Sequence, residues 1–173
     1  MSESNNNFIA YEYKEISVRR DMETVYVDAY PSFGWKLEGT GHSLSVGNVN
    51  LKFKRNRKLP NKAELTRLQR EFESQVKEIE KLEESKLITP SAVAYGIGII
   101  GSAFMAGAMF SYLAGNLPLC IILAIPAFIG WIIPYFAYQK ITQKKIEQVT
   151  PMIDRQYDVV YEVCEKASGL IYG

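Results

Sequence analysis

Few of the side chains that usually carry catalysis occur in this sequence. It has one histidine, His42, in the glycine-rich segment GTGHSLSVG, and two cysteines, Cys120 and Cys164. No cysteine or carboxylate stands near His42 at the spacing of metal ligands, and no base is identifiable beside Cys164 to activate it as a nucleophile. No phosphate-binding loop or nucleophile elbow occurs either. We therefore expect an exposed histidine, no cofactor or metal, and no enzymatic activity.

Charge is distributed unevenly along the chain. Every residue from Leu87 to Gln139 is uncharged, and the remainder holds all 20 basic and 19 acidic side chains. A membrane-spanning helix needs about 20 apolar residues, so the run predicts two spans, 90–113 and 118–138, joined by an external turn at 114–117. Both helices would be apolar on every face, and the rest of the chain is too small to cover them. A bilayer is therefore favoured over a soluble core.

The residues of this turn suit a helical hairpin. Gly115 fits a helix C-terminus, and Pro118 fits the first turn of the next helix, where its missing N–H is not needed. Basic residues flank both ends of the uncharged run, whereas the turn has none. This pattern predicts a multi-pass plasma-membrane protein with both termini in the cytoplasm. Lys140, Lys144 and Lys145 are also candidate contacts for anionic lipid head groups. The alternative, which we favour, is that these lysines only set the topology.

Small residues recur at every fourth position of the first predicted span. They are Ala94, Gly98, Ser102 and Ala106. On a helix these residues share one face, and small residues allow helices to approach closely in lipid. The stripe therefore predicts a helix–helix contact, either with the second span or with another copy of the chain. A pore or substrate path is the alternative, but such paths usually contain an ionisable residue, and this run has none.

Apolar residues continue at helical spacing on both sides of the uncharged run. Segments 60–89 and 139–173 are predicted to form the two helices of a cytoplasmic stalk, the first starting at a capping box of Asn61 and Glu64. If the turn is centred near Asn116, residues whose numbers sum to about 232 face each other, which brings apolar seam against apolar seam as in a coiled coil. The seam residues are Leu65, Leu68, Phe72, Ile79, Ile153, Val160 and Cys164, with Gln75 as a polar seam position.

Two prolines interrupt these helical patterns. Thr89-Pro90 and Thr150-Pro151 are each expected to break or kink a helix, because proline lacks the N–H that would continue the hydrogen-bond ladder.

The N-terminal part reads as a small β-α-β-β unit over residues 8–59, preceded by a disordered segment 1–7. NVNLKFKR alternates apolar and polar residues, as a half-buried strand does, and WKLEG and YEYKEISVRR are the other strand candidates. Residues 22–30 fit either helix or strand, and Asp21 as an N-cap favours helix. Residues 1–7 are polar and acidic, which is not typical of a cleaved signal peptide.

Short motifs in this unit resemble those of a bacterial family of small β-α-β-β domains of unknown function. The matching stretches are Tyr13-Lys14, Gly34-Trp35-Lys36-Leu37 and Phe53-Lys54-Arg55; the family pattern is Tyr-Lys, Gly-Trp-Glu-Leu and Phe-Lys-Arg, so Lys36 replaces a glutamate. The whole chain is similar to uncharacterised two-span membrane proteins of Gram-positive bacteria. Neither likeness implies an activity.

Taken together, the sequence predicts an α+β membrane protein in which a small head precedes a long antiparallel helical hairpin with two spans and a coiled-coil-like stalk. The function we expect is that of a non-enzymatic, membrane-anchored interaction or scaffold protein. Its partners would be the bilayer and a protein, either a different one or a second copy, and not nucleic acid. The alternative is an oligomeric channel or an accessory subunit of a membrane transport complex.

Overall fold

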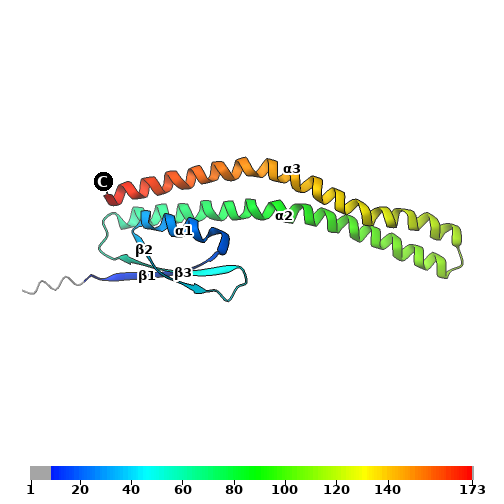
Figure 1. Cartoon of the computed structure of the whole chain (residues 1–173), viewed down its shortest axis with the longest axis horizontal. Helices are drawn as coiled ribbons and strands as arrows, with labels where there is room; N and C mark the ends of the chain where they lie inside the picture. The colour runs from blue at the N-terminus through cyan, green and yellow to red at the C-terminus, as the bar shows by residue number, and fades with distance from the viewer. Residues whose placement is uncertain (1–8, 173) are drawn as a thin grey trace, which may run out of the picture. The chain divides into compact units, whose positions relative to one another are not determined.

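The computed structural model describes residues 9–172, so the segment 1–7, predicted to be disordered, lies outside the described residues. Its elements follow the order drawn in Figure 1. They are β1 (Tyr11–Arg19), η1 (Arg20–Met22), α1 (Glu23–Ala29), η2 (Tyr30–Phe33), β2 (Trp35–His42), β3 (Asn48–Asn56), α2 (Lys62–Leu113) and α3 (Leu117–Tyr172). Within residues 9–172 a three-stranded antiparallel sheet precedes two long apolar helices, which confirms that part of the predicted fold.

The chain divides into two compact units. The head unit comprises Met1–Val76 and Tyr157–Gly173, and the hairpin unit comprises Lys77–Gln156. Each long helix contributes its outer end to the head unit and the rest to the hairpin unit.

The sheet of the head unit has strand order β1-β3-β2. As the alternation in NVNLKFKR predicts, Val49, Leu51 and Phe53 of β3 are buried. In β2 only part of the expected alternation holds, because Trp35 is buried but Leu37 is 40% exposed. Leu37 pairs with the buried Phe53, but β2 lies at the edge of the sheet. The register of β2 against β3 shifts only after Leu37, before Gly39, so this bulge changes the face of the side chains that follow it.

Residues 22–30 form the helix that the sequence favoured over a strand. The short α1 is continued at each end by a 3₁₀ turn, η1 before it and η2 after it. The proposed cap was wrong, since Met22 occupies the N-cap of α1 and Asp21 is ion-paired with Arg19 at 2.5 Å. Gly34 then ends η2 with a φ of 81°, a backbone conformation that glycine adopts without strain.

Aromatic rings from the segment that precedes α2 pack against α2, and together they form the core of the head unit. Phe72 of α2 lies 5.5 Å from the ring centroids of both Tyr26 and Phe33, and Tyr30 lies 4.3 Å from Phe53 beneath the sheet. The buried residues that the two long helices add are Leu65, Leu68, Phe72, Val76, Val160, Val163 and Ala167. A domain of about 50 residues has little core of its own, and here the helices supply a large part of it.

The hairpin unit contains the turn that joins α2 to α3. Gly115 has a φ of 78°, and the N–H of Asn116 donates to Ser111 O at 3.0 Å, which satisfies a carbonyl at the end of α2. Pro118 lies in the first turn of α3, as expected. Both helices pass through their prolines, Pro90 in α2 and Pro151 in α3 among them, without interruption. Of the two predicted outcomes, a break or a kink, the break does not occur at either proline, because one missing backbone hydrogen bond is not enough to end a long helix whose other bonds are intact.

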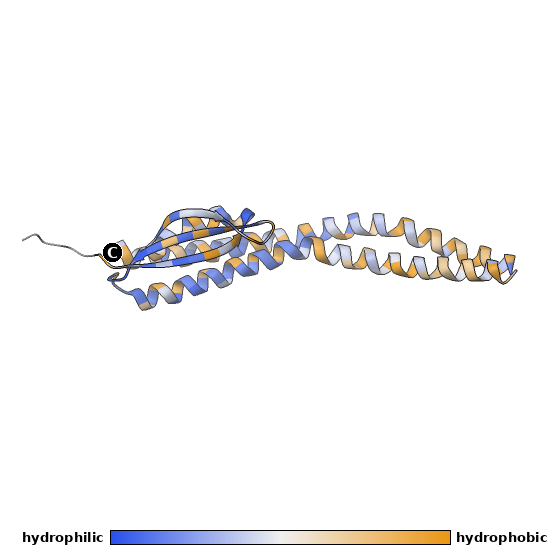
Figure 2. Cartoon of the chain, turned by 90° about the horizontal axis from the view of Figure 1, so that it is seen from below, coloured by the Kyte–Doolittle hydropathy of each residue, from blue (hydrophilic) through white to orange (hydrophobic). Residues whose placement is uncertain are grey.

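Few residues in the apolar parts of α2 and α3 are buried. Among the described residues these two helices are long and apolar enough to cross a membrane, and in the most apolar 18-residue window of each only 11% (α2) and 6% (α3) of the residues are buried. Figure 2 shows orange and white with little blue on both helices near the turn that joins them, whereas blue and orange mix in the head unit.

Candidate functional site

The small-residue stripe lies in the hairpin unit, where Ala94, Gly98 and Ser102 line an open groove with Trp131 and Pro134 of α3. Ala94 and Gly98 are half-buried, whereas Ser102 and Ala106 are exposed. A Cβ added to Gly98 would meet nothing within 4 Å, and the Ser102 hydroxyl donates to Gly98 O at 2.9 Å within its own helix. Half of the stripe, Ser102 and Ala106, is therefore exposed, and Gly98 has room for a side chain.

A different pair of glycines makes the close contact between α2 and α3. A Cβ on Gly101 would lie 3.0 Å from the Gly130 carbonyl carbon, and a Cβ on Gly130 only 2.7 Å from Gly101 Cα. Such proximity is possible only without side chains, as at packed membrane helices. Sequence reasoning missed this pair, although its numbers sum to 231 and the proposed register, centred near Asn116, nearly predicts it.

The predicted seam residues are mostly buried. Leu65, Leu68 and Phe72 lie in the core of the head unit, as does Val160, and Cys164 is half-buried there. Ile79 and Ile153 are buried in the hairpin unit. At the outer end of the two helices, the Asn61 amide donates to Leu170 O at 3.4 Å, again a pair whose numbers sum to 231.

Two details of the seam differ from the prediction. Val76 is fully buried, whereas Gln75 is half-buried. The buried seam residue at this turn of the helix is therefore Val76 and not the predicted Gln75. At the helix start, Asn61 has a φ of 53° and Glu64 pairs with Arg67 at 2.7 Å. The helix begins where predicted, but these side chains do not form the reciprocal pair of a capping box.

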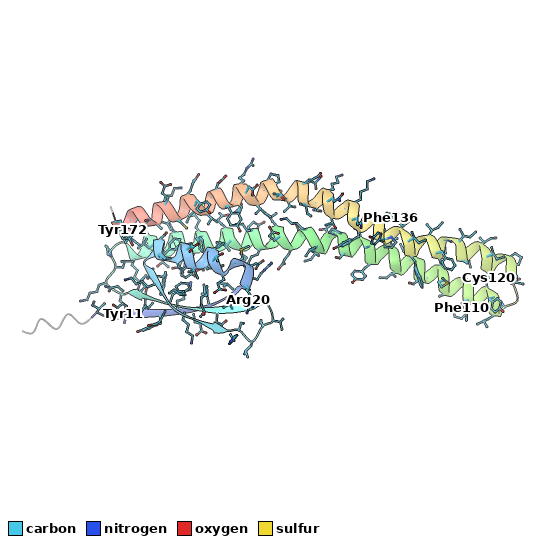
Figure 3. The ribbon with its side chains drawn as sticks, viewed as in Figure 1. Tyr11, Arg20, Phe110, Cys120, Phe136 and Tyr172 are labelled. Carbon is cyan, nitrogen blue, oxygen red and sulfur yellow. The ribbon has the colours of Figure 1, made fainter. Side chains whose placement is uncertain are left out.

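The three candidate lipid-contacting lysines lie on α3 in the hairpin unit. Lys140 and Lys144 are exposed, and Lys145 is half-buried. Phe110 and Cys120 flank the turn at the other end of this unit (Figure 3).

A cluster of hydrogen bonds around Glu73 joins the head to α2. Its Oε1 accepts from Lys14 Nζ at 2.6 Å, Gln69 Nε2 at 2.8 Å and Tyr30 Oη at 2.9 Å. Gln69 in turn accepts from the buried indole Nε1 of Trp35 at 2.8 Å. The cluster thus links β1, η2 and β2 to one face of α2.

This arrangement controls the ionisation of two groups. Burial opposes the charged form of Glu73, but the hydrogen bonds from Lys14, Gln69 and Tyr30 outweigh it and hold the pKa of the carboxyl below its ordinary value. Burial, and next the neighbouring Glu73 carboxylate, raises the pKa of Tyr30 well above its usual range. Glu73 is therefore an anion and Tyr30 a neutral donor at neutral pH, which makes the cluster a structural clamp.

A second cluster surrounds Arg55, whose side chain is only 4% exposed. Its Nε donates to Glu12 at 2.6 Å, and its guanidinium lies 4.3 Å from the Trp35 ring centroid. Lys62 at the start of α2 also donates to Glu12, at 2.5 Å. Desolvation opposes ionisation of Glu12, but the bonds from Lys62 and Arg55 keep its pKa below the ordinary value. Trp35 and Arg55, from two of the motifs noted in the sequence, are thus in contact and stabilise the head.

Sequence reasoning missed both clusters, although part of the signal was present. Arg55 continues the inward alternation of Val49, Leu51 and Phe53, and Gln69 lies one helical turn before Glu73. The acidic partner of each cluster is separated from its bases by tens of residues, and spacing alone does not reveal such pairs.

The residues considered for catalysis lie apart from these clusters. Cys164 borders a cavity of about 420 Å³ between α1 and α3, where burial raises the pKa of its thiol to about 11. His42, at the end of β2, is exposed. Within residues 9–172 no group of three or more His, Cys, Asp and Glu side chains could hold a metal ion.

Comparison with protein-family models, curated proteins and solved structures found no match to this chain. The resemblance drawn from the short motifs therefore stays a hypothesis.

Replacing Glu73 by Gln should lower the stability of the head unit in a pH-dependent way. Because folding lowers the pKa of Glu73 from 4.5, its stabilising effect is present above pH 4.5 and is lost as the pH falls through the folded-state value. The difference in unfolding free energy between wild type and E73Q should shrink as the pH drops below 4.5, measured by urea denaturation in detergent. E71Q, on the same helix, is the control, and a constant difference for E73Q would contradict the assignment.

Proposed function

We propose that this protein is a non-enzymatic, membrane-anchored interaction or scaffold protein. The observation that carries the proposal is the combination of two long apolar helices, few of whose residues are buried, with a folded head in which the buried Trp35 and Arg55 side chains hydrogen-bond within the head unit.

Exposure of the helices supports anchoring in a bilayer. A soluble core helix is mostly buried, whereas the apolar windows of α2 and α3 are 11% and 6% buried. A helix satisfies all its backbone hydrogen bonds internally, so its exposed surface can face hydrocarbon at no polar cost. We assign residues 90–113 and 118–138 to the bilayer of the plasma membrane. The lysines beyond both spans favour cytoplasmic termini, and Lys140, Lys144 and Lys145 would then lie at the lipid head groups.

Exposed tyrosines on the head unit support a role in protein binding. They are Tyr11, Tyr13, Tyr161 and Tyr172, with exposed fractions of 43%, 69%, 70% and 80%. Tyrosine is enriched at protein interfaces because its ring buries a large area while its hydroxyl still finds a polar partner. The partner is a protein, either a different one or a second copy of this chain.

A photo-crosslinking amino acid at Tyr13 or Tyr161 tests the proposal in native membranes. Both side chains are largely exposed, so the substitution should leave the core intact while placing the probe at the interface. We expect one or both positions to give a discrete adduct of constant mass. The same probe at Ile121 of the second span, which should face lipid, is the control and should not capture that protein. Absence of any adduct at both head positions would count against the proposal.

The alternative, an oligomeric channel or an accessory subunit of a transport complex, is favoured by the open small-residue stripe. A Cβ added to Gly98 would meet nothing within 4 Å and Ser102 is exposed, as expected of a surface that packs against another membrane helix.

The variants G98L and G101L test whether the small-residue stripe joins protomers, as the oligomeric alternative requires. If the stripe joins protomers, G98L should reduce the oligomer on native gels about tenfold, equivalent to about 1.4 kcal/mol, while the hairpin stays folded. G101L is the matched contrast, because its side chain would collide with Gly130 and should destabilise the hairpin itself. A G98L protein that runs identically to wild type would contradict the oligomeric alternative.

A further inference from the structure

A cavity at one end of the sheet of the head unit brings two of the sequence motifs together. Its volume is about 350 Å³. Residues 34–36, around the start of β2, and residues 54–56, at the end of β3, both line it. The strand pairing holds the two segments in register, with Trp35 opposite Arg55. The motifs therefore meet at a single cavity, for which a protein-binding role gives no explanation.

Basic side chains gather at this cavity without matching acids. Lys36 and Lys54 are direct partners across the two strands, and like charges in such positions destabilise a sheet. Lys54 is paired with Glu38 at 2.9 Å, whereas Lys36 forms no ion pair within residues 9–172. The exposed Arg57 and Lys58, in the loop that follows β3, add further positive charge. Of the described residues that line the cavity none is acidic, so a bound anion would relieve the repulsion at Lys36.

Aromatic and aliphatic side chains form much of the remaining wall. The exposed Tyr11 and Tyr172 line the cavity, together with the half-buried Leu59 and Ile171. A flat ring packs well on tyrosine and aliphatic surfaces. An apolar wall with a few convergent polar groups is the usual composition of a small-molecule site, and here the charge of those groups selects an anion.

Hydrogen bonds hold the polar part of the wall in place. Asn56 Oδ1 accepts from Lys58 N at 2.9 Å, and Arg55 Nη1 donates to Phe33 O at 3.3 Å. No described residue accepts from Asn56 Nδ2, so this amide can donate to a ligand. The cavity is thus largely formed before any ligand binds, as is common for small-molecule sites.

We propose that this cavity binds a small aromatic anion, with its charged group beside Lys36 and Asn56 and its ring against the tyrosines of the wall. Ammonium and amide N–H groups are suitable donors to the oxygens of phosphate or carboxylate. All residues involved belong to the head unit, so the inference does not depend on the membrane anchoring. It gives the head a ligand in addition to the protein partner proposed above.

The indole signal of Trp35 in ¹H–¹⁵N NMR spectra tests this site directly. The chain has two tryptophans, so Trp131→Phe leaves only the indole that lines the cavity. The full chain in a non-ionic detergent is titrated with phenyl phosphate. Benzyl alcohol serves as the uncharged ring, and inorganic phosphate as the anion without a ring. We expect phenyl phosphate to shift the signal saturably, with a midpoint about tenfold below that of either control, because only phenyl phosphate makes both kinds of contact.

Substitutions of Lys36 separate binding from folding. Lys36→Gln should raise the midpoint about tenfold, because it removes a hydrogen bond to a charged group. Lys52→Gln is the matched control, since Lys52 is an exposed lysine of β3 that does not line the cavity. Lys36→Glu should abolish the shift and yet make the head more stable to urea, because a glutamate would pair with Lys54 across the strands.

The contrary outcomes are equally clear. An indole signal that phenyl phosphate leaves unchanged overturns the proposal, and so does an equal midpoint in Lys36→Gln and the parent chain. Equal midpoints for phenyl phosphate and either control overturn the requirement for an aromatic anion. A Lys36→Glu chain that is less stable than the parent contradicts the repulsion on which the site is argued.

Discussion

The exposed apolar surface of α2 and α3 has a lower free energy in hydrocarbon than in water. Within the described residues the apolar windows of both helices are almost wholly uncovered, and burying one leucine or isoleucine contributes about 1.5 to 3 kcal/mol. Every residue from Leu87 to Gln139 is uncharged, so no charged side chain in this stretch opposes transfer to lipid. The close pairing of Gly101 with Gly130 suits the same environment, because helices in lipid associate through close packing and not through hydrophobic burial.

The head is too small to form a stable hydrophobic core from its own residues. Its sheet covers α2 with one face, and Phe72 completes an aromatic core with Tyr26, Tyr30 and Phe33. The clusters around Glu73 and Arg55 then fix the orientation of sheet and helix by charge-assisted hydrogen bonds, which are stronger than neutral ones. The buried side chains of Trp35 and Arg55 are hydrogen-bonded within the head unit, while several of its tyrosines are exposed.

Periodicity in the sequence predicted the elements well and their contacts less well. The strand with Val49, Leu51 and Phe53, the helical hairpin and the turn at Gly115 were confirmed because each depends on a local pattern. Leu37 pairs with the buried Phe53 but lies in the edge strand β2 and is 40% exposed; the alternation pattern does not show which strand lies at the edge of the sheet. Val76, and not the predicted Gln75, is buried, because this part of α2 packs on the head as well as on α3. The Glu73 cluster joins residues 59 apart, and only the folded chain shows such a pairing.

Labelling by a membrane-impermeant maleimide tests the central claim most directly, that a bilayer surrounds the uncharged run with both chain ends on one side. Asn116→Cys in the turn and Lys166→Cys in α3 are compared in a chain lacking the native cysteines. The turn should be labelled in intact cells and position 166 only after permeabilisation. Labelling of position 166 in intact cells, or a chain that stays in solution without detergent, would contradict the claim.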